Sequence, residues 1–295
     1  MSVKKFDLII VGAGPAGLMA AMQAKRQGLA VAIFEKARVG GQALAANLIE
    51  NFPGYPDAIR GPELVRRIVC QVEAHGVEIT PGEVLSVFRE NGCFAVKVKD
   101  GVYRALSVII ATGLSPKRLG LSGERELFGE LVFSYENPEQ LPCRNKQVLV
   151  IGSGDAAFDQ ALNFSRFASG VSIAMRSEKP RCAPLLLKRA KIAGVEIFAG
   201  CEVVSMKKVS GRLHIDFADG KTRETDLFDI CIGKEKNFDF ISSDLLVGGV
   251  PGIFFAGDCH RDHARHVVIA CGDGTAAAME AAEYLFKMVD NKGMR

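Results

Sequence analysis

The chain has 295 residues, enough for about two domains of ordinary size. Hydrophobic residues make up 48% of it and charged residues 24%, so it can bury ordinary cores and is not an intrinsically disordered chain. The formal net charge of +3 arises from 37 basic and 34 acidic residues, and this balance argues against nucleic acid as a partner.

The first apolar stretch covers residues 8–22, and three glycines and a proline interrupt it. It is shorter than a membrane span, and the acidic Asp7 together with the glycine spacing favours a strand, a turn and a helix over a signal peptide. We therefore expect no membrane association and a cytoplasmic location.

Two similar segments organise the chain. Residues 6–17 read FDLIIVGAGPAG and residues 147–157 read QVLVIGSGDAA; each is a β-branched run that leads through a glycine-rich turn into a helical pattern. A further apolar strand follows each of them, at 29–34 and at 171–175. Two dinucleotide-binding βαβ units in one chain are the simplest interpretation of this repeat.

The other predicted elements are shorter. Residues 78–110 are rich in strand patterns, with hairpin signals at Asn91-Gly92 and Asp100-Gly101. More short strands are predicted around 203–233 and at 252–258, and a long helix over 267–289. The candidate hinges are 113–116 and 246–251.

The first glycine turn has the spacing Gly12-x-Gly14-x-x-Gly17. The first glycine permits the tight turn, the second lets the backbone approach a pyrophosphate, and the third lets the helix and the strand pack closely. The helix N-terminus then points at the phosphates. Glu35 lies eighteen residues past Gly17, where an acid accepts hydrogen bonds from a ribose.

Further motifs are more specific. Residues 40–42 read Gly-Gly-Gln, 51–54 read Asn-Phe-Pro-Gly, 111–113 read Ala-Thr-Gly, and 252–258 read Gly-Ile-Phe-Phe-Ala-Gly-Asp. In this order and spacing the chain resembles, over nearly its whole length, the thioredoxin reductase family of FAD/NAD(P)-binding proteins (class II pyridine nucleotide-disulfide oxidoreductases). This resemblance implies a FAD site built from Gly12, Gly14, Pro15, Ala16, Gly17, Glu35, Lys36, Gly41, Gln42, Asn51, Val84, Ala111, Thr112, Gly113, Gly257, Asp258, Arg265, His266 and Val267.

The resemblance also implies roles for some of these residues. Gly41, Gln42 and Asn51 would line the flavin. Val84 would contact the adenine side, and Asp258 would hold the ribityl chain. Arg265-His266-Val267 begins the last helix, whose N-terminus would face the flavin pyrimidine ring. His266 stands where the family has a glutamine, which makes it a candidate catalytic residue.

The second glycine turn reads Gly152-x-Gly154-x-x-Ala157. Met175 occupies the position that corresponds to Glu35, so no acid repels a 2′-phosphate there, and Arg176 and Arg181 follow. We interpret this as an NADPH site formed by Gly152, Gly154, Asp155, Ala156, Arg176, Arg181 and Gly233. The alternative is that both arginines are solvated surface charges and that the loop binds nothing.

The predicted fold is α/β, with two Rossmann-like three-layer dinucleotide-binding domains, the NADPH domain being inserted in the FAD domain. The predicted FAD domain comprises residues 1–114 and 247–295, and the NADPH domain residues 115–246. The resemblance also implies a homodimer.

The redox cysteines of the family are absent from the segment that aligns with them, residues 132–138, which reads VFSYENP. No Cys-x-x-Cys occurs among the eight cysteines, and the closest pair is Cys259 and Cys271. A dithiol relay needs two thiols in contact with each other. Tyr135 is a candidate to reach the flavin instead. The cluster Cys259-His260-x-Asp262-His263-x-x-His266 could suggest metal ligands, but we expect no metal.

Three hypotheses on function remain. The first is an NADPH-dependent flavoenzyme that passes electrons to an external acceptor, namely a small electron-carrier protein (ferredoxin or flavodoxin) or a small molecule (a quinone or oxygen), as in the ferredoxin–NADP reductases of the thioredoxin reductase type. The second is a flavin-binding redox sensor or partner protein without turnover. The third is a disulfide reductase that uses distant cysteines, such as Cys259 with Cys271.

Overall fold

The computed structural model describes residues 5–293. The chain divides into two compact units, each described by itself below. The first unit comprises residues 1–43, 50–114 and 236–295, and the second comprises residues 44–49 and 115–235.

The first unit is built on a sheet that branches at β6. Its strands are β1 (Lys5–Val11), β2 (Val31–Glu35), β3 (Ile79–Pro81), β4 (Val84–Glu90), β5 (Cys93–Val98), β6 (Gly101–Ile110) and β17 (Ile253–Phe255). The order is β3-β2-β1-β6-β5-β4, and β17 also pairs with β6. The strands β3, β2, β1, β6 and β17 are parallel, whereas β4, β5 and β6 form an antiparallel meander. The hairpin predicted at Asn91-Gly92 joins β4 to β5, with φ of 50° and 78° at these residues.

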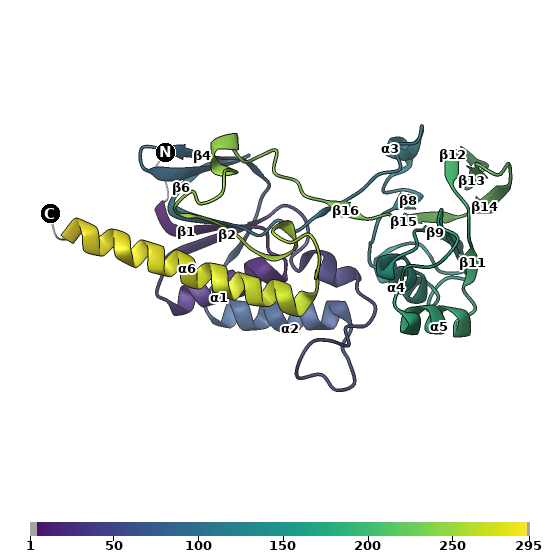
Figure 1. The fold of residues 1–295 in the computed structure, drawn as a ribbon, viewed down its shortest axis with the longest axis horizontal. Coiled ribbons are helices and arrows are strands. Elements are labelled where there is room, and N and C mark those ends of the chain that lie inside the picture. Colours follow the sequence, from purple (N-terminus) through teal and green to yellow (C-terminus); the bar gives the residue numbers. More distant parts are fainter. Residues whose placement is uncertain (1–4, 294–295) are drawn as a thin grey trace. The chain divides into compact units, whose positions relative to one another are not determined.

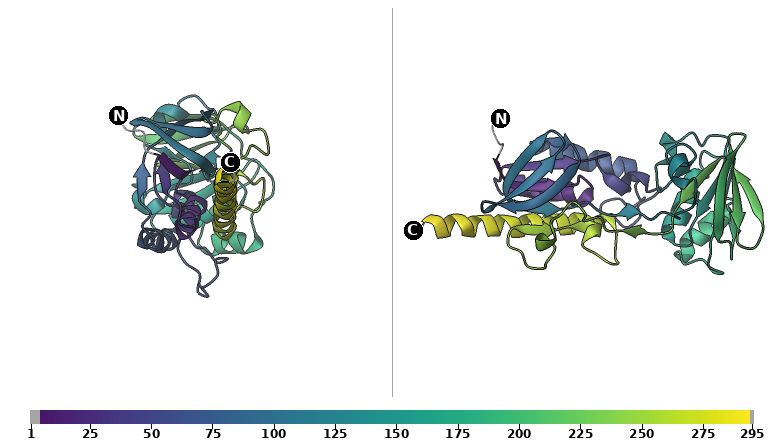
Figure 2. Two further views of the ribbon diagram at one scale, coloured as in Figure 1. Left: turned by 90° about the vertical axis from the view of Figure 1, so that its left-hand side faces the viewer. Right: turned by 90° about the horizontal axis from the view of Figure 1, so that it is seen from above.

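Three helices cover the parallel part of this sheet: α1 (Pro15–Arg26), α2 (Gly61–Ala74) and α6 (Val267–Gly293). They lie side by side with α1 in the middle, as the end-on view in Figure 2 shows. The meander covers the opposite face, so the unit has three layers (Figure 1). The two short turns η3 (Ser243–Leu245) and η4 (Gly257–Cys259) precede the final helix.

The second unit repeats this plan. Its parallel sheet has the order β11-β10-β9-β15-β8, from β8 (Val132–Phe133), β9 (Gln147–Ile151), β10 (Gly170–Ala174), β11 (Glu196–Phe198) and β15 (Leu227–Ile230). The helices α4 (Asp155–Phe164) and α5 (Pro184–Ile192) lie on one face (Figure 1). The meander β12 (Val203–Val209), β13 (Arg212–Phe217) and β14 (Thr222–Thr225) forms the third layer. The remaining elements are β7 (Ser115–Pro116), paired with β16 (Lys234–Glu235), the helix α3 (Glu124–Leu127) and the turn η2 (Pro138–Gln140).

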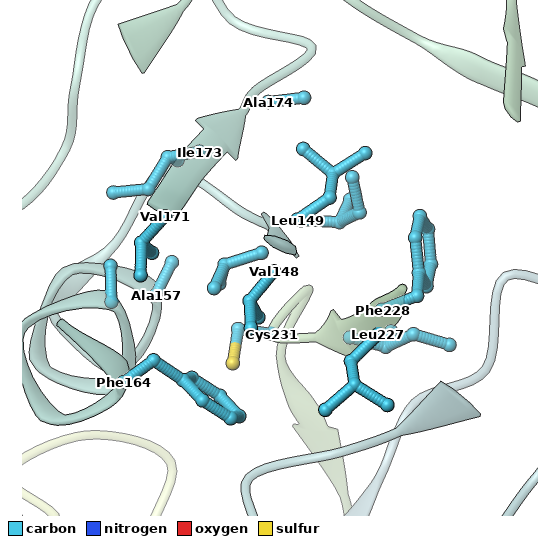
Figure 3. Packing of buried hydrophobic residues seen from close by; sticks show 14 of the residues in the cluster. Val148, Leu149, Ala157, Phe164, Val171, Ile173, Ala174, Leu227, Phe228 and Cys231 are labelled. Carbon is cyan, nitrogen blue, oxygen red and sulfur yellow. The ribbon is translucent and has the colours of Figure 1, made fainter. Parts of the chain in front are cut away.

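The core of the second unit lies on both faces of the parallel sheet, one of which α4 covers (Figure 3). Val148 and Leu149 of β9 and Phe228 of β15 are buried, as are Ala157 and Phe164 of α4. A β-branched run in each strand and small or aromatic residues on one face of α4 account for this packing. Two Rossmann-like three-layer units, as predicted from the sequence, are therefore present.

The boundaries of the units differ from the predicted ones at two places. Residues 236–246 belong to the first unit, not to the second, because Ile241 forms a parallel bridge with Val87 and both are buried in the core of the first unit. Residues 44–49 belong to the second unit, because Asn47 N donates to Asp159 Oδ2 (3.1 Å) and Asn163 Nδ2 donates to the carbonyl oxygen of Ala45 (3.2 Å).

Within residues 5–293, no helix has both the length and the apolar character that crossing a membrane requires.

Candidate functional site

The first glycine turn is closed against the end of β6. Gly12 has φ of 102°, and a Cβ there would lie 2.5 Å from the carbonyl oxygen of Ala111. A Cβ on Gly17 would lie 1.8 Å from the carbonyl oxygen of Gly12. Gly14, in contrast, has nothing within 4 Å of such a Cβ. The turn therefore needs two of its glycines for packing and leaves open space over the third.

That open space lies at the N-terminus of α1. Gly14 is the N-cap residue and makes no side-chain cap hydrogen bond, and Pro15 and Ala16 form the first turn. The uncapped backbone N–H groups and the helix dipole together suit a phosphate. Gly41 of η1 (Gly41–Ala45) adjoins this space, because a Cβ on it would lie 3.5 Å from the Cα of Gly14.

Glu35 ends β2 beside the same turn. Its Oε2 accepts a hydrogen bond from the backbone N–H of Ala13 (2.8 Å), and its Oε1 accepts one from Ala37 (2.9 Å). These bonds hold the carboxylate at the glycine turn, at the position predicted to receive a ribose. Lys36 is exposed and lies 3.7 Å from Glu83.

The start of α6 also meets the first glycine turn. A Cβ on Gly257 would lie 2.8 Å from Cβ of Ala16, and a Cβ on Gly274 would lie 2.0 Å from the carbonyl oxygen of Ala16. The structure thus brings residues of η4 and α6 against the beginning of α1, although more than 240 residues separate them in the sequence.

Asn51 and His266 are in contact. The Asn51 Nδ2 and His266 Nδ1 atoms are 3.2 Å apart, and both residues are exposed. The loop before α6 is fixed by Arg261, whose guanidinium donates two hydrogen bonds to Asp273 (2.6 Å each). Arg265 in turn donates from Nε and Nη2 to the carbonyl oxygen of Arg261 (3.2 and 2.9 Å).

The other residues of the predicted FAD site lie on neighbouring elements of the first unit. Gln42 Nε2 donates to the carbonyl oxygen of Leu114 (2.5 Å), just after the Ala111-Thr112-Gly113 turn. Asp258 lies in η4, and Val267 is the first residue of α6. Val84, at the start of β4, is buried in the core with Phe34.

The second glycine turn has the same construction as the first. Gly152 has φ of 149°, and a Cβ there would lie 2.3 Å from the carbonyl oxygen of Cys231, while Gly154 has nothing within 4 Å. Gly154 is the uncapped N-cap of α4, and Asp155 and Ala156 form the first turn. The Asp155 carboxylate accepts a hydrogen bond from the backbone of Ala183 (2.7 Å).

The two predicted phosphate-binding arginines differ in how firmly they are held. Arg181 donates from Nε to Ser153 Oγ (3.0 Å) and from its backbone to the carbonyl oxygen of Ser153 (2.7 Å), so it lies on the glycine turn. Arg176 follows β10, its side chain is 79% exposed, and its guanidinium lies 3.7 Å from Glu202.

Tyr135 lies in a cluster that sequence patterns did not predict. Its φ is 53°, unusual for a residue with a side chain, and its backbone N–H donates to Asp229 Oδ1 (2.9 Å). The ammonium of Lys234 lies 4.0 Å from the centre of its ring. A carboxyl in the otherwise apolar strand Leu227–Ile230 was the one signal of this arrangement.

The cysteines are free, and burial disfavours the thiolate forms of several of them. Desolvation raises the pKa of the Cys143, Cys231 and Cys259 thiols, and that of Cys271 to about 11. Among the described residues, no group of three or more His, Cys, Asp or Glu side chains is placed to hold a metal ion.

Comparison with known proteins identifies the family of the chain. A model of the family "pyridine nucleotide-disulphide oxidoreductase" matches residues 6–274. The chain belongs to this family.

Relatives within the pyridine nucleotide-disulphide oxidoreductases include two thioredoxin reductases. That of Treponema pallidum is 36% identical, over 95% of this chain and 97% of the relative. That of Bacillus subtilis is 32% identical, over 96% of this chain and 95% of the relative. The crystal structure of Lactococcus lactis thioredoxin reductase in its FR conformation superposes with a TM-score of 0.85 at 29% identity, covering 96% of this chain and 99% of that one.

As a member of this family the chain is a thioredoxin-reductase-like flavoprotein oxidoreductase, with FAD and NADPH as its cofactors. The structure fits both groups, because each glycine turn leaves open space at an uncapped helix N-terminus. The predictions of family, fold class and cofactors are confirmed. The individual site residues remain predictions.

Proposed function

We propose that this oxidoreductase passes electrons from NADPH through FAD to an external acceptor without a dithiol relay. The observation that carries this proposal is the segment 132–138, which contains no cysteine, in a chain without any Cys-x-x-Cys. Two thiols that exchange electrons with a flavin and with a partner disulfide must lie side by side.

The surroundings of the remaining cysteines support the proposal. Cys259 is 1% exposed and Cys271 8% exposed, and burial raises the pKa of both thiols, that of Cys271 to about 11. Because the thiolate is the attacking form, both are poor nucleophiles near neutral pH. Cys259 donates instead to the carbonyl oxygens of Ile110 (3.4 Å) and Ala256 (3.3 Å). A disulfide reductase based on these two cysteines is therefore the weaker hypothesis.

The chain's own residues would bind and orient the two cofactors. The FAD, when bound, supplies a group that accepts a hydride and releases electrons. Glu35 would accept hydrogen bonds from its ribose, and the N-terminus of α1 would bind its pyrophosphate. Asn51 and His266, which contact each other, would lie at the flavin ring. In the second unit, Arg181 and Arg176 would bind the 2′-phosphate of NADPH.

The external acceptor is a small electron-carrier protein, such as a ferredoxin or a flavodoxin, or a small molecule such as a quinone. We also propose that the chain forms a homodimer, as the family resemblance implies.

The test combines rapid mixing with steady-state assays. Anaerobic mixing with NADPH should bleach the flavin's visible absorbance within seconds, and NADH should do so more slowly. Turnover with ferricyanide or a quinone should survive treatment with iodoacetamide, and thioredoxin disulfide should not be reduced. Reduction of thioredoxin that alkylation abolishes would overturn the proposal.

A pair of variants sharpens the test. Tyr135→Cys with Pro138→Cys introduces the Cys-x-x-Cys spacing into the segment without cysteines, and Tyr135→Ser with Pro138→Ser is the matched control. We expect thiol-dependent disulfide reduction to appear only in the cysteine variant. If the purified protein holds FAD and neither nucleotide bleaches it, the non-turnover sensor is the better hypothesis.

A further inference from the structure

Asp229 is a buried carboxyl that neither cofactor site explains. It is 1% exposed and lies on β15, between β9 and β8, with Val150 and Phe133 as its register neighbours. A carboxylate in the middle of an apolar sheet is unfavourable unless hydrogen bonds compensate for its desolvation. Its two oxygens accept from Tyr135 N (2.9 Å) and from Cys231 Sγ (3.2 Å).

These two hydrogen bonds connect different parts of the second unit. Backbone pairing of β15 with β8 ends at Phe133, and two side-chain hydrogen bonds continue it: Ser134 Oγ donates to the carbonyl oxygen of Ile230 (2.6 Å), and Asp229 receives the N–H of Tyr135. The chain turns away at Tyr135 with φ of 53°. Since this left-handed conformation is unfavourable for a residue with a side chain, the surrounding bonds must hold it.

On its other side Asp229 adjoins the nucleotide-binding turn. Cys231 N donates a hydrogen bond to the carbonyl oxygen of Ile151 (2.7 Å). The carbonyl oxygen of Cys231 packs closely against Gly152, because a Cβ on Gly152 would lie only 2.3 Å from it. The helix α4 holds the same segment from its own side, because Gln160 Nε2 donates to the carbonyl oxygen of Glu136 (2.9 Å). The Tyr135–Glu136 turn is thus attached both to the strand end and to the helix that flank the second glycine turn.

We propose that Asp229 is a positioning residue that, when ionised, fixes the Tyr135 turn against the second glycine turn, so that NADPH binding depends on its charge. This inference rests on the NADPH site proposed for the second unit. It does not depend on the identity of the electron acceptor.

The charge of Asp229 changes in an accessible pH range. Burial raises its pKa to about 6, the hydrogen bonds from Cys231 and Tyr135 oppose this effect, and Glu136 raises the pKa whereas Lys234 lowers it. Above pH 6 the carboxylate accepts both hydrogen bonds. Below pH 6 one oxygen carries a proton and is a weaker acceptor.

The experiment measures the Kd of NADP+ for the FAD-loaded protein by calorimetry, from pH 5 to pH 8. Wild type is compared with Asp229→Asn, which keeps the shape of the side chain and cannot ionise. Asp219→Asn, in the exposed turn after β13, is the matched control. Because the 2′-phosphate of the nucleotide titrates in this range too, the informative quantity is the ratio of the two Kd values at each pH.

We expect the Asp229→Asn variant to bind NADP+ about fivefold more weakly than wild type at pH 8, and equally well at pH 5, because a charged acceptor is roughly twice as strong as a neutral one. The control should keep a ratio of one throughout. A ratio that does not change with pH would show a merely structural role and overturn the inference.

A second variant keeps the inference testable if Asp229→Asn does not fold. Glycine adopts a positive φ without strain, so Tyr135→Gly should no longer need Asp229 to hold the turn. The Kd of this variant should therefore rise less than that of wild type when the pH falls from 8 to 5. An equal rise in both proteins would also contradict the inference. Neither binding measurement uses an electron acceptor. Failure of the proposed electron transfer would therefore appear only in the turnover assays and not in these Kd values.

Discussion

At the scale of single residues, Glu35 is a firmly held member of the proposed FAD site. Its two oxygens accept backbone hydrogen bonds from Ala13 and Ala37, and these fix the glycine turn as well as the carboxylate. In Glu35→Gln one of these acceptors becomes an N–H donor that faces another donor. We expect FAD affinity to fall by about tenfold, in line with about 1.5 kcal/mol for a charge-assisted hydrogen bond. The ratio of flavin to protein absorbance after dialysis measures this loss.

The control for Glu35 is Glu83→Gln. Glu83 also carries a carboxylate near β2, but this carboxylate lies 3.7 Å from the exposed Lys36 and so forms a surface ion pair. Surface ion pairs of this kind contribute little. Equal retention of FAD by both variants would show that Glu35 does not contribute to the site.

The two arginines after β10 should contribute unequally to nucleotide selectivity. Arg181 is held on the glycine turn by Ser153, whereas Arg176 is largely exposed. A pre-positioned guanidinium loses less conformational entropy when it binds a phosphate. We expect Arg181→Ala to lower the preference for NADPH over NADH by about tenfold and Arg176→Ala by less, as measured by kcat/KM for each nucleotide.

A suitable control for this comparison is Lys191→Ala, on the last turn of α5. It removes a positive charge from the same unit without touching the glycine turn. A larger effect of Arg176→Ala than of Arg181→Ala would show that Arg181 has a structural and not a phosphate-binding role.

At the scale of elements, the contact between α1 and α6 depends on one glycine. A Cβ on Gly274 would lie 2.0 Å from the carbonyl oxygen of Ala16. A Cβ on Gly272, two residues earlier in the same helix, would meet nothing within 4 Å. We expect Gly274→Ala to destabilise the chain by about 1–3 kcal/mol and to weaken FAD binding, because α1 must move.

Gly272→Ala is the matched control within the same helix. It should stabilise the chain by about 0.5–1 kcal/mol, because glycine is a poor helix former. Thermal unfolding, followed by the fluorescence of released FAD, compares the two variants. Similar shifts in Tm for both would contradict the close packing of α1 and α6.

Elements were predictable from the sequence to the extent that their determinants are local. The strands and glycine turns around Gly12 and Gly152 follow from β-branched runs and glycine spacing over a few residues. The contact of Asn51 with His266 joins residues 215 positions apart, and the family resemblance implied only that each of them lies at the flavin. The Asp229–Tyr135 bond has no local signature beyond a carboxyl in an apolar strand, so its partner could not be predicted.

The boundaries of the units were likewise predictable only where a local sequence signal marks them. The crossover after residue 114 coincides with a Gly113–Pro116 turn signal. The second crossover lies at 235 and not at 246, because backbone pairing of residues 240–242 with Val87 adds this stretch to the first unit. Such pairing depends on a strand that is distant in sequence, and a local composition pattern does not contain it.

At the scale of the whole molecule, the free energy of unfolding should depend on pH through the ionisation of Asp229. Its pKa is raised from 3.8 to about 6 in the folded state, so between these values the folded state binds more protons than the unfolded state. The contribution of Asp229 to stability is therefore greatest at low pH and is lost as the pH rises to 6, by up to about 3 kcal/mol, since one pKa unit corresponds to about 1.4 kcal/mol.

Urea denaturation at pH 4.5, 5.5 and 7 measures this effect as the difference between wild type and Asp229→Asn. The exposed carboxylates whose pKa is lowered, such as Glu63 and Asp262, have the opposite pH dependence but are the same in both proteins. Wild type should lose stability relative to the variant as the pH rises. A constant difference would mean that Asp229 has an ordinary pKa in the folded state.

The segment 44–49 has a consequence for exchanging parts between relatives. The chain passes from one unit to the other after residues 43, 49, 114 and 235, so the second unit is not contiguous in the sequence. A chimera that replaces only 115–235 would pair a foreign α4 with Ala45 and Asn47, and a helix without side chains equivalent to Asp159 and Asn163 would lack both hydrogen bonds. A functional graft of this unit must therefore transfer two pieces of the gene together, one of them only six codons long.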